Sequence, residues 1–261
     1  MQFCSLASGS TGNCYYIGDG YSGLLVDAGI SAKAIEQGLR GQMGIEPQQL
    51  QGILITHEHH DHIKSVGTLA RRYGLPIFAT QGTWQGMGDK VGKIPDSLQC
   101  VLPDTQQMNL GSYDLEWFST HHDAQEPVSY VIHHEAQKIG IATDTGVLNP
   151  EIIGKLYNSQ VIVIEANHDI QMLKSGRYPY YLKQRILGDW GHLSNEACGQ
   201  GLQEMIGGAT KHVVLAHLSQ ENNLPQLAHQ TVKNILLNSR LSGRLNLWVA
   251  SAQQFSVPLL L

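Results

Sequence analysis

Short apolar segments recur along the chain, and each of them ends in a polar or histidine-rich loop. The alternation predicts strands at residues 15–17, 24–27, 53–56, 76–79, 115–119, 128–132, 139–143, 161–165 and 213–216. Apolar residues at helical spacing predict helices at residues 31–40, 63–73, 195–205 and 224–238. Residues 106–110 and 113–119 read as a hairpin, so strands and helices do not alternate strictly. This order favours mixed sheets over a doubly wound parallel sheet.

The composition is that of a protein with a substantial core. Of the 261 residues, 42% are hydrophobic and 15% are charged, which argues against disorder. The length alone is compatible with two small domains or one large layered domain. The 28 glycines and 9 prolines are spread along the chain and do not gather into one linker. We therefore expect a single domain over residues 1–261.

The net charge and the cysteine content limit the partners and the cellular compartment that we expect for the protein. A formal net charge of -5 argues against coating of nucleic acid by bulk electrostatics, although a local basic patch stays open. The four cysteines form no C-x-x-C pair, so neither a zinc ribbon nor a disulfide framework is indicated. The N-terminus does not resemble a signal peptide, and no stretch approaches the ~20 apolar residues of a membrane span. We expect a cytoplasmic protein without membrane contact, whose oligomeric state the sequence does not define.

The main chemical signal is a histidine motif. The sequence Thr56-His57-Glu58-His59-His60-Asp61-His62 directly follows the apolar segment 51–55. A strand that runs into such a loop can present His57 and His59 on one side, while the following turn sends Asp61 and His62 to a neighbouring position. Histidine and aspartate are the ligands of zinc, manganese and iron sites. The motif therefore predicts two adjacent metal positions.

The pattern H-x-H-x-D-H resembles the signature of the metallo-β-lactamase superfamily, and the resemblance spans nearly the whole chain. Further matching segments follow in the expected order: Asp27-Ala28-Gly29, Thr120-His121-His122-Asp123, Thr143-Asp144-Thr145-Gly146 and Leu215-Ala216-His217-Leu218-Ser219. The resemblance implies an α/β (α+β) fold, the αββα sandwich of two mixed β-sheets flanked by helices.

The resemblance also implies a ligand set for two divalent metal ions. It assigns His57, His59 and His122 to one metal. It assigns Asp61, His62 and His217 to the other, with Asp144 bridging both. Zinc and manganese are the favoured ions, and iron is compatible with the same ligands. His121 adjoins His122 and could replace it, and the sequence T-D-T-G could be a plain strand-ending turn.

Other segments point to a branch of the superfamily. Residues 5–13, 165–169, 191–195 and 216–223 resemble the YycJ/WalJ group, which implies a 5′-to-3′ DNA exonuclease and a DNA substrate. The order G-H-x-S, followed by a metal-binding histidine, also resembles the tRNA 3′-processing nucleases. That resemblance implies that His192 assists at the scissile phosphate. The alternative is an interior histidine that caps the helix starting near Asn195.

The expected reaction is hydrolysis of a phosphodiester bond by a metal-bridging hydroxide. The expected catalytic residues are Asp61, which orients the nucleophile, and His192, which assists the leaving group. A small-molecule hydrolase, either a cyclic phosphodiesterase or a glyoxalase II-like thioesterase, would use nearly the same metal centre. A catalytically silent nucleic-acid binding module is a further alternative.

A mixed basic and aromatic segment, residues 174–185, is a candidate substrate contact. Its basic residues are Lys174, Arg177, Lys183 and Arg185. Lysine and arginine pair with phosphate, while tyrosines stack on unpaired bases. An exposed amphipathic helix with Tyr181 and Leu182 packed inward is an equally good interpretation.

Two further features stay open at the sequence level. The loop 8–13 reads as a tight turn that could bring Ser8, Ser10 or Asn13 near the metals to orient their ligands. His168 could either approach substrate or belong to a buried polar network.

Overall fold

The computed structural model describes residues 1–237 and 245–261. These fall into two compact units. The first unit comprises Met1–Asp114, Ala124–Val128 and Ser251–Leu261, and the second comprises Leu115–Asp123 and the described part of Ser129–Ala250. The single domain expected from the sequence stays a prediction. Among the described residues, no helix has the length and apolar character needed to cross a membrane.

The first unit is built on a mixed sheet. Its strands, in spatial order, are β14 (Leu259–Leu260), β1 (Gln2–Ala7), β2 (Cys14–Gly18), β3 (Gly23–Val26), β4 (Leu50–Leu54), β5 (Ile77–Ala79) and β6 (Gln99–Val101). The pairs from β14 to β3 are antiparallel, and those from β3 to β6 are parallel. Every residue of β2 and β3 is buried, as their uninterrupted apolar sequences require.

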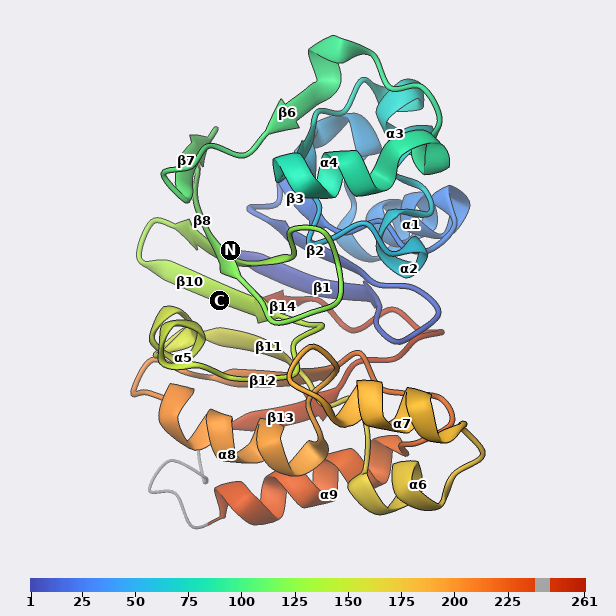
Figure 1. Ribbon diagram of the computed structural model, residues 1–261. Helices are drawn as coiled ribbons and strands as arrows, with labels where there is room; N and C mark the ends of the chain where they lie inside the picture. The colour runs from blue at the N-terminus through green and yellow to red at the C-terminus, as the bar shows by residue number, and fades with distance from the viewer. Residues whose placement is uncertain (238–244) are drawn as a thin grey trace. The chain divides into compact units, whose positions relative to one another are not determined.

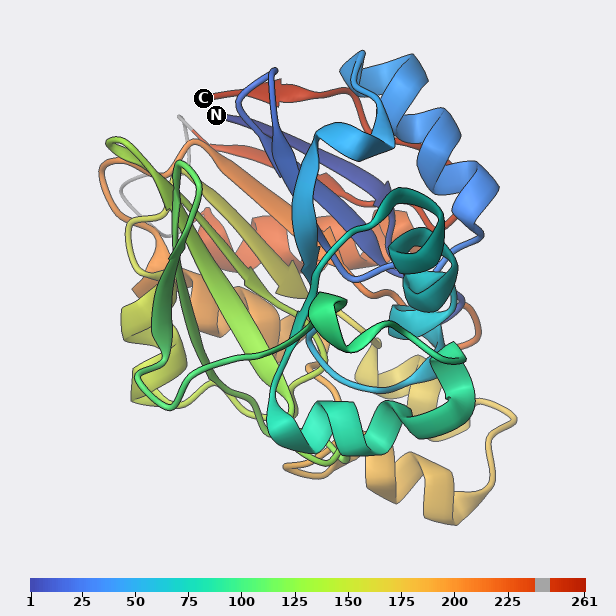
Figure 2. The same cartoon turned by 90° about the horizontal axis from the view of Figure 1, so that it is seen from above.

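Helices cover this sheet and close its core. They are α1 (Ala32–Gly38), α2 (His60–Ile63), α3 (Val66–Tyr73) and α4 (Gln81–Met87), with a π-helix at Leu39–Met43 and short 3-10 helices at Pro47–Gln49, Gly88–Val91 and Asp96–Leu98. Ile35 and Leu39 join Leu25 and Ile53 in one buried cluster. In Figure 2, α1 (blue) lies alongside the blue strands of the same unit.

The other seven-stranded sheet found in the described residues lies mostly in the second unit, whereas residues 107–110, 113, 114 and 128 of its strands fall within the bounds of the first. Its order is β13 (Asn246–Val249), β12 (His212–Ala216), β11 (Val161–Glu165), β10 (Gln137–Ala142), β9 (Val128–His134), β8 (Tyr113–Ser119) and β7 (Gln107–Leu110). The pairs from β13 to β10 are parallel, and β10 pairs with β9 in antiparallel fashion. The carboxyl ends of β10, β11 and β12 therefore meet at one edge of the sheet.

Five helices of the second unit are α5 (Pro150–Leu156), α6 (Ile170–Ser175), α7 (Tyr180–Leu187), α8 (Asn195–Met205) and α9 (Pro225–Leu236). Figure 1 shows α8 and α9 side by side next to β12 and β13. Leu202 of α8 and Val232 of α9 pack with Ile164 and Leu215 of the sheet in one buried cluster. Burial of these apolar faces holds the carboxyl ends of β11 and β12 in place.

Left-handed backbone conformations follow several strands, and three of these positions are candidate metal ligands or residues that support them. Asp27 follows β3 with φ 61°, Asp144 follows β10 with φ 57°, and His217 follows β12 with φ 52°. A residue with a side chain adopts this conformation at a cost of roughly 1–2 kcal/mol, and such costs gather at functional sites. All three lie in segments that the sequence analysis singled out.

The two mixed sheets with flanking helices confirm the predicted fold class. The helix predicted at 195–205 is α8, whereas the one predicted at 63–73 is broken after α2. The break has a local cause, because the Ser65 amide donates to the Ala28 carbonyl and its hydroxyl donates to the Ile30 carbonyl. The helix predicted at 224–238 matches α9 up to Leu236, and its expected end at Asn238 lies outside the described residues.

Candidate metal centre

The histidine motif of the first unit follows β4 and runs into α2. His57 is buried, and its Nε2 lies 3.0 Å from Nδ1 of His59, the N-cap residue of α2. Asp61 and His62 follow within the first turn of that helix, where Asp61 Oδ2 and His62 Nε2 are 3.6 Å apart. The structure therefore gathers the four motif residues named as ligands, as the spacing in the sequence predicts.

The buried carboxylate of Asp27 orients the residues of the histidine motif. Asp27 is fully buried and accepts from the amide and hydroxyl of Thr56, at 2.9 Å each, and from Nδ1 of His62 at 2.7 Å. Because Nδ1 carries the proton, the lone pair of His62 is on Nε2, the side on which Asp61 lies. Burial raises the pKa of Asp27, and His62 and Thr56 oppose that effect.

The loop 8–13 contacts the same cluster through Asn13. Its side-chain amide lies 3.1 Å from His62 Nε2 and 3.5 Å from Asp61 Oδ2. Its backbone amide donates to the Asp61 carbonyl at 2.8 Å. Of the three loop residues considered from the sequence, Asn13 is the one beside the motif, since Ser10 is exposed and the Ser8 hydroxyl bonds to Tyr15.

Gly29 explains why the segment Asp27-Ala28-Gly29 ends in glycine. A Cβ atom at this position would lie 1.6 Å from the carbonyl oxygen of Asp61. Only a residue without a side chain lets the loop after β3 pack directly on the backbone of the histidine motif. The glycine of this segment, which matched the superfamily in the sequence, therefore has a structural reason: two backbone segments approach each other closely at this position.

The second unit forms its own cluster at the carboxyl ends of β10, β11 and β12. Asp144, Glu165, His192 and His217 each offer one ligand atom, and these atoms all lie within 4.8 Å of one another. Asp144 Oδ1 is 3.3 Å from His217 Nδ1 and 3.8 Å from His192 Nδ1. The parallel order of these strands brings together residues that are far apart in the sequence.

Glu165 acts as the buried support of this cluster. Its Oε1 accepts from Nδ1 of both His192 and His217 at 2.7 Å, and its Oε2 accepts from the backbone amides of Thr145 and Leu193 at 3.1 and 3.2 Å. With four donors on two oxygens, Glu165 is better suited to orient ligands than to bind a metal itself. Sequence reasoning quoted the residue but assigned it no role.

The charge of Glu165 governs the protonation of its neighbours. Complete burial alone would raise the pKa of Glu165, but His192 and His217 hold that pKa well below its ordinary range. Burial also acts to lower the pKa of His192, yet the ion pair with Glu165 leaves it raised. His192 is consequently suited to carry a proton near neutral pH.

His122 joins the second cluster, and His121 does not. His122 is buried, its Nδ1 donates to the Gly191 carbonyl at 3.3 Å, and its Nε2 lies 3.8 Å from Asp144 Oδ1. His121 instead packs its ring against Trp190. The geometry therefore favours His122 over His121 as a ligand.

His192 does not cap the helix that follows it. Ser194 is the N-cap of α8, and its hydroxyl accepts from the Ala197 amide at 3.1 Å. The imidazole of His192 is turned to Glu165 and lies 5.0 Å from the ring of His122 and 5.4 Å from that of His217, between centroids. The capping alternative considered from the sequence is wrong.

Of the four basic residues in segment 174–185 that are candidate substrate contacts, two already have partners and the other two are exposed. Lys183 donates to the carbonyl of Lys174, and Arg185 forms an ion pair with Asp123, so both have partners within the second unit. Lys174 and Arg177 are exposed and form no ion pair within residues 1–237 and 245–261. Tyr181 is 74% exposed, which excludes the alternative in which it packs inward.

His168 is buried near this cluster but takes no part in it. Neither ring nitrogen has a hydrogen-bond partner in the described part of the chain. Burial lowers the pKa of His168 to about 4, although Glu165 opposes the shift. The histidine is therefore neutral in the folded protein at neutral pH.

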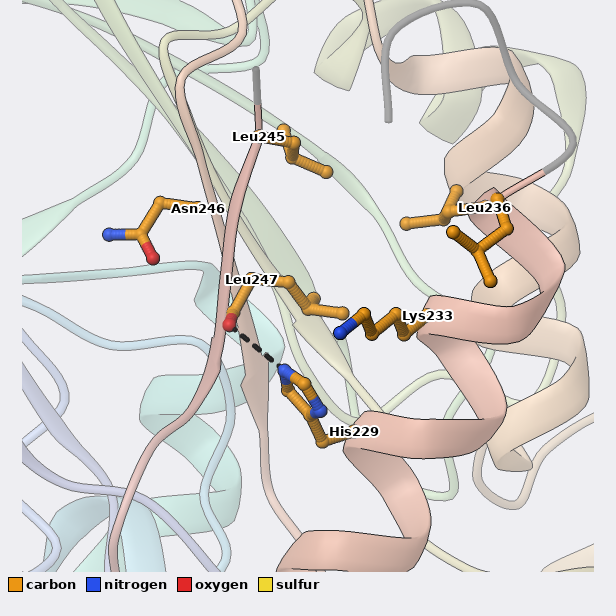
Figure 3. A pocket seen from close by; sticks show the side chains of 7 residues that line it. His229, Lys233, Leu236, Leu245, Asn246 and Leu247 are labelled. Carbon is orange, nitrogen blue, oxygen red and sulfur yellow. Dashed lines mark hydrogen bonds between the residues drawn. The ribbon is translucent and has the colours of Figure 1, made fainter. Parts of the chain in front are cut away.

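One pocket of the second unit lies away from these residues. Figure 3 shows this pocket, lined by His229, Lys233, Leu236, Leu237, Leu245, Asn246 and Leu247 between α9 and β13. His229 Nε2 donates to the Leu247 carbonyl at 3.2 Å, which is a structural contact. This pocket contains none of the candidate ligands.

The combination of mixed sheets, strand-end histidines and buried supporting carboxylates defines a class. A family model described as the metallo-beta-lactamase superfamily matches residues 7–197. The chain belongs to the metallo-β-lactamase superfamily, and its His/Asp clusters are typical of the dinuclear metal sites of that superfamily.

Relatives narrow this class. The chain is 42% identical over 236 residues to exodeoxyribonuclease YycJ of Bacillus anthracis, which covers 90% of this chain and 89% of that protein. It is 41% identical over 243 residues to exodeoxyribonuclease WalJ of Streptococcus pneumoniae, with coverage of 92% and 90%. The resemblance to the YycJ/WalJ group is confirmed: the chain is a homologue of these proteins over most of its length.

Solved structures confirm the fold. The metallo-β-lactamase fold protein YhfI of Bacillus subtilis superposes with a TM-score of 0.71 at 17% identity, covering 98% of each chain. The short form of human tRNase Z gives a TM-score of 0.65 at 15% identity, covering 99% of this chain and 100% of that one.

Proposed function

We propose that this protein is a metal-dependent 5′-to-3′ exodeoxyribonuclease that hydrolyses phosphodiester bonds in DNA. The observation that carries the proposal is a shared orientation of the histidines. In His62, His122, His192 and His217, Nδ1 faces an oxygen acceptor, so that the lone pair is on Nε2. Histidines prepared in this way are metal ligands or proton carriers, and the two relatives above are named exodeoxyribonucleases.

The proposed ligand set combines the two clusters. It assigns His57, His59 and His122 to one divalent ion, and Asp61, His62 and His217 to the other, with Asp144 shared between them. Support comes from the membership in the superfamily and from the grouping of candidate ligand residues within each unit. Zinc or manganese fits this nitrogen and oxygen set best, and iron is compatible with it.

Two bound ions would lower the pKa of a water molecule and offset the charge that develops on the phosphate. Asp61 would orient that water through its second carboxylate oxygen. His192, whose pKa Glu165 keeps raised, would donate a proton to the departing sugar oxygen from Nε2. Cleavage of the bond to the 3′-oxygen would leave a 3′-hydroxyl on the released nucleotide and a 5′-phosphate on the shortened strand, so that the next nucleotide to be released carries a 5′-phosphate.

The proposal also includes the substrate, the residues that contact it and the location of the enzyme. DNA is the expected substrate, and Lys174 and Arg177 on the exposed segment are the expected phosphate contacts. Lys183 and Arg185 are less suited to that role because both already have partners. The cytoplasmic location expected from the sequence stays a prediction.

The test is digestion of end-labelled DNA by protein of known metal content. Purified protein loaded with zinc or manganese should shorten single-stranded DNA from its 5′ end and release 5′-mononucleotides. Asp61→Ala and His59→Ala should abolish this activity and lower the metal content while the circular dichroism spectrum stays native. Full activity of either variant would contradict the site, and hydrolysis of S-acyl glutathione in preference to DNA would contradict the substrate.

A further inference from the structure

Trp190 is a large aromatic side chain on the surface of the second unit, and it lies between α7 and α8 in the sequence. Its side chain is 60% exposed although indole is strongly apolar. No part of the ligand set or the proton transfer described above uses this side chain. An exposed indole near the candidate metal ligands can stack on the aromatic face of a ligand.

A tight turn fixes the backbone of Trp190. The Gly191 amide donates to the Gly188 carbonyl at 2.9 Å, which places Asp189 and Trp190 at the tip of a β-turn. A Cβ atom at Gly191 would lie 2.3 Å from the carbonyl oxygens of Arg185 and Ile186, so the turn is packed directly on the end of α7. The indole is therefore presented by a rigid support and not by a loose loop.

His121 supports the indole from one side. The two ring centroids are 5.5 Å apart with an angle of 46° between the planes. His121 is itself held in place, since its carbonyl accepts from the Gly146 amide at 2.9 Å. Gly146 in turn packs against the turn, because a Cβ atom there would lie 2.4 Å from the Asp189 carbonyl oxygen.

The same turn is joined to the candidate catalytic residues. The Gly191 carbonyl, one residue after Trp190, accepts from His122 Nδ1, and His192 follows directly. Arg185, at the end of α7, pairs with Asp123 next to His122. Two more exposed aromatics, Tyr180 at 77% and Tyr181 at 74%, lie on α7 itself.

We propose that Trp190, supported by His121, is a stacking platform for a base of the DNA strand at the end being cleaved. This inference rests on the proposed function, since a nucleobase is the aromatic ligand which a DNA strand brings to His192. Stacking on an indole is tolerant of sequence, which suits an exonuclease that must accept every base. It would hold the strand end while successive phosphates enter the site.

The test is equilibrium binding of single-stranded DNA, measured by fluorescence anisotropy. One labelled oligonucleotide is intact, and its twin lacks the bases of the first two nucleotides at the 5′ end. Trp190→Ala should weaken binding of the intact strand about 5- to 150-fold, the range that loss of one stacked base produces. The wild type and Trp190→Ala should bind the base-less twin equally.

Two matched variants separate stacking from general damage. Trp190→Phe keeps an aromatic face and should retain most of the affinity. Tyr157→Ala removes another exposed aromatic of the same unit, 52% exposed and located before β11, at the end opposite to Glu165; its binding should equal that of the wild type. Native thermal unfolding of Trp190→Ala should show that its fold is unchanged.

The outcomes distinguish this inference from the proposed function. Equal affinity of Trp190→Ala and wild type for the intact strand, or an equal loss for both strands, would overturn the platform. If the metal-loaded wild type cleaves DNA in that case, the exonuclease proposal stands without it. If the base-dependent loss is found but no DNA is cleaved, the platform stands and the proposed reaction fails.

Discussion

The two clusters hold similar ligands but are assembled in different ways. In the first unit, His57, His59, Asp61 and His62 come from six consecutive residues after a single strand. In the second unit, Asp144 and His217 follow two different strands, and His192 comes from a loop. A continuous motif can be found in a sequence by its spacing, whereas a dispersed cluster exists only once parallel strands place their carboxyl ends at one edge.

The buried carboxylates that orient the two clusters, Asp27 and Glu165, also differ from each other. Asp27 serves one histidine and one threonine, while Glu165 serves two histidines and two backbone amides. Both are fully buried, yet the pKa of Asp27 is raised and that of Glu165 is lowered. Two histidines oppose the effect of burial on the pKa of Glu165, whereas only one histidine does so at Asp27, and the two pKa shifts have opposite directions.

The largest expected effect follows from replacing Glu165. Glu165→Gln removes the charge and turns a side-chain N–H group toward existing donors, so both His192 and His217 lose their orientation. We expect the kcat of DNA hydrolysis to fall about 100-fold, at the upper end for loss of a residue that orients metal ligands. The measurement is turnover at saturating metal together with bound metal per chain.

A surface carboxylate of the same unit is the control for this variant. Glu116 is part exposed and pairs with Lys155 and His133. Glu116→Gln should leave kcat within about 2-fold, because surface ion pairs contribute little. Equal losses in the two variants would show that Glu165 has no special role in the second cluster.

His168 also lies near Glu165, but its pKa is lowered, whereas the pKa of His192 is raised. Its folded-state pKa of about 4 lies below the ordinary 6.5, so between these pH values the unfolded chain binds a proton that the folded chain does not. Stability should therefore fall as pH falls from about 6.5 to 4. Wild type should lose about 2 kcal/mol more than His168→Gln between pH 7 and pH 5.

Urea unfolding of both proteins at the two pH values gives these free energies. At pH 7 the comparison serves as its own control, because His168 is neutral in the folded state and mostly neutral in the unfolded state, so its titration contributes little there. Parallel pH profiles for the two proteins would mean that His168 is accessible to protons in the folded state.

Asp27→Asn should have a smaller effect than Glu165→Gln, since His62 alone depends on this carboxylate for its orientation. We expect the affinity for one of two metal ions to fall about 10-fold, with the other unchanged. Competition with a chromogenic chelator resolves the two affinities. A loss at both sites equal to that in Glu165→Gln would remove the difference between the two carboxylates.

The sequence allowed most of the fold to be predicted, for identifiable reasons. The strand at 161–165 and the helix at 195–205 have strong apolar periodicity and match β11 and α8. Strand β1 was missed, although five of its six residues are buried. Its sequence mixes glutamine, cysteine and serine with apolar residues, and this mixture hides the apolar pattern.

The grouping of the candidate ligands after strand ends could be anticipated from the sequence, but the carboxylates that support them could not. Asp27 and Glu165 both stand at the end of a buried apolar strand, and that position was the available signal. Their roles depend on which histidines the fold brings within 2.7 Å, and this distance follows from sheet order and loop packing. The same is true of Trp190, whose exposure has no signature in the sequence.

The smallest expected effect concerns two arginines of the basic segment in the second unit. Arg177 is exposed and Arg185 pairs with Asp123, so only Arg177 is available to phosphate without breaking an ion pair. Arg177→Gln should reduce the slope of log affinity against log salt by about 0.7, the value for one contact with single-stranded DNA. Arg185→Gln should leave the slope unchanged and lower stability by less than about 1 kcal/mol. Anisotropy titrations at salt concentrations between about 50 and about 300 mM measure the slope of each variant. A reduced slope in Arg185→Gln would show that this arginine leaves Asp123 to bind DNA.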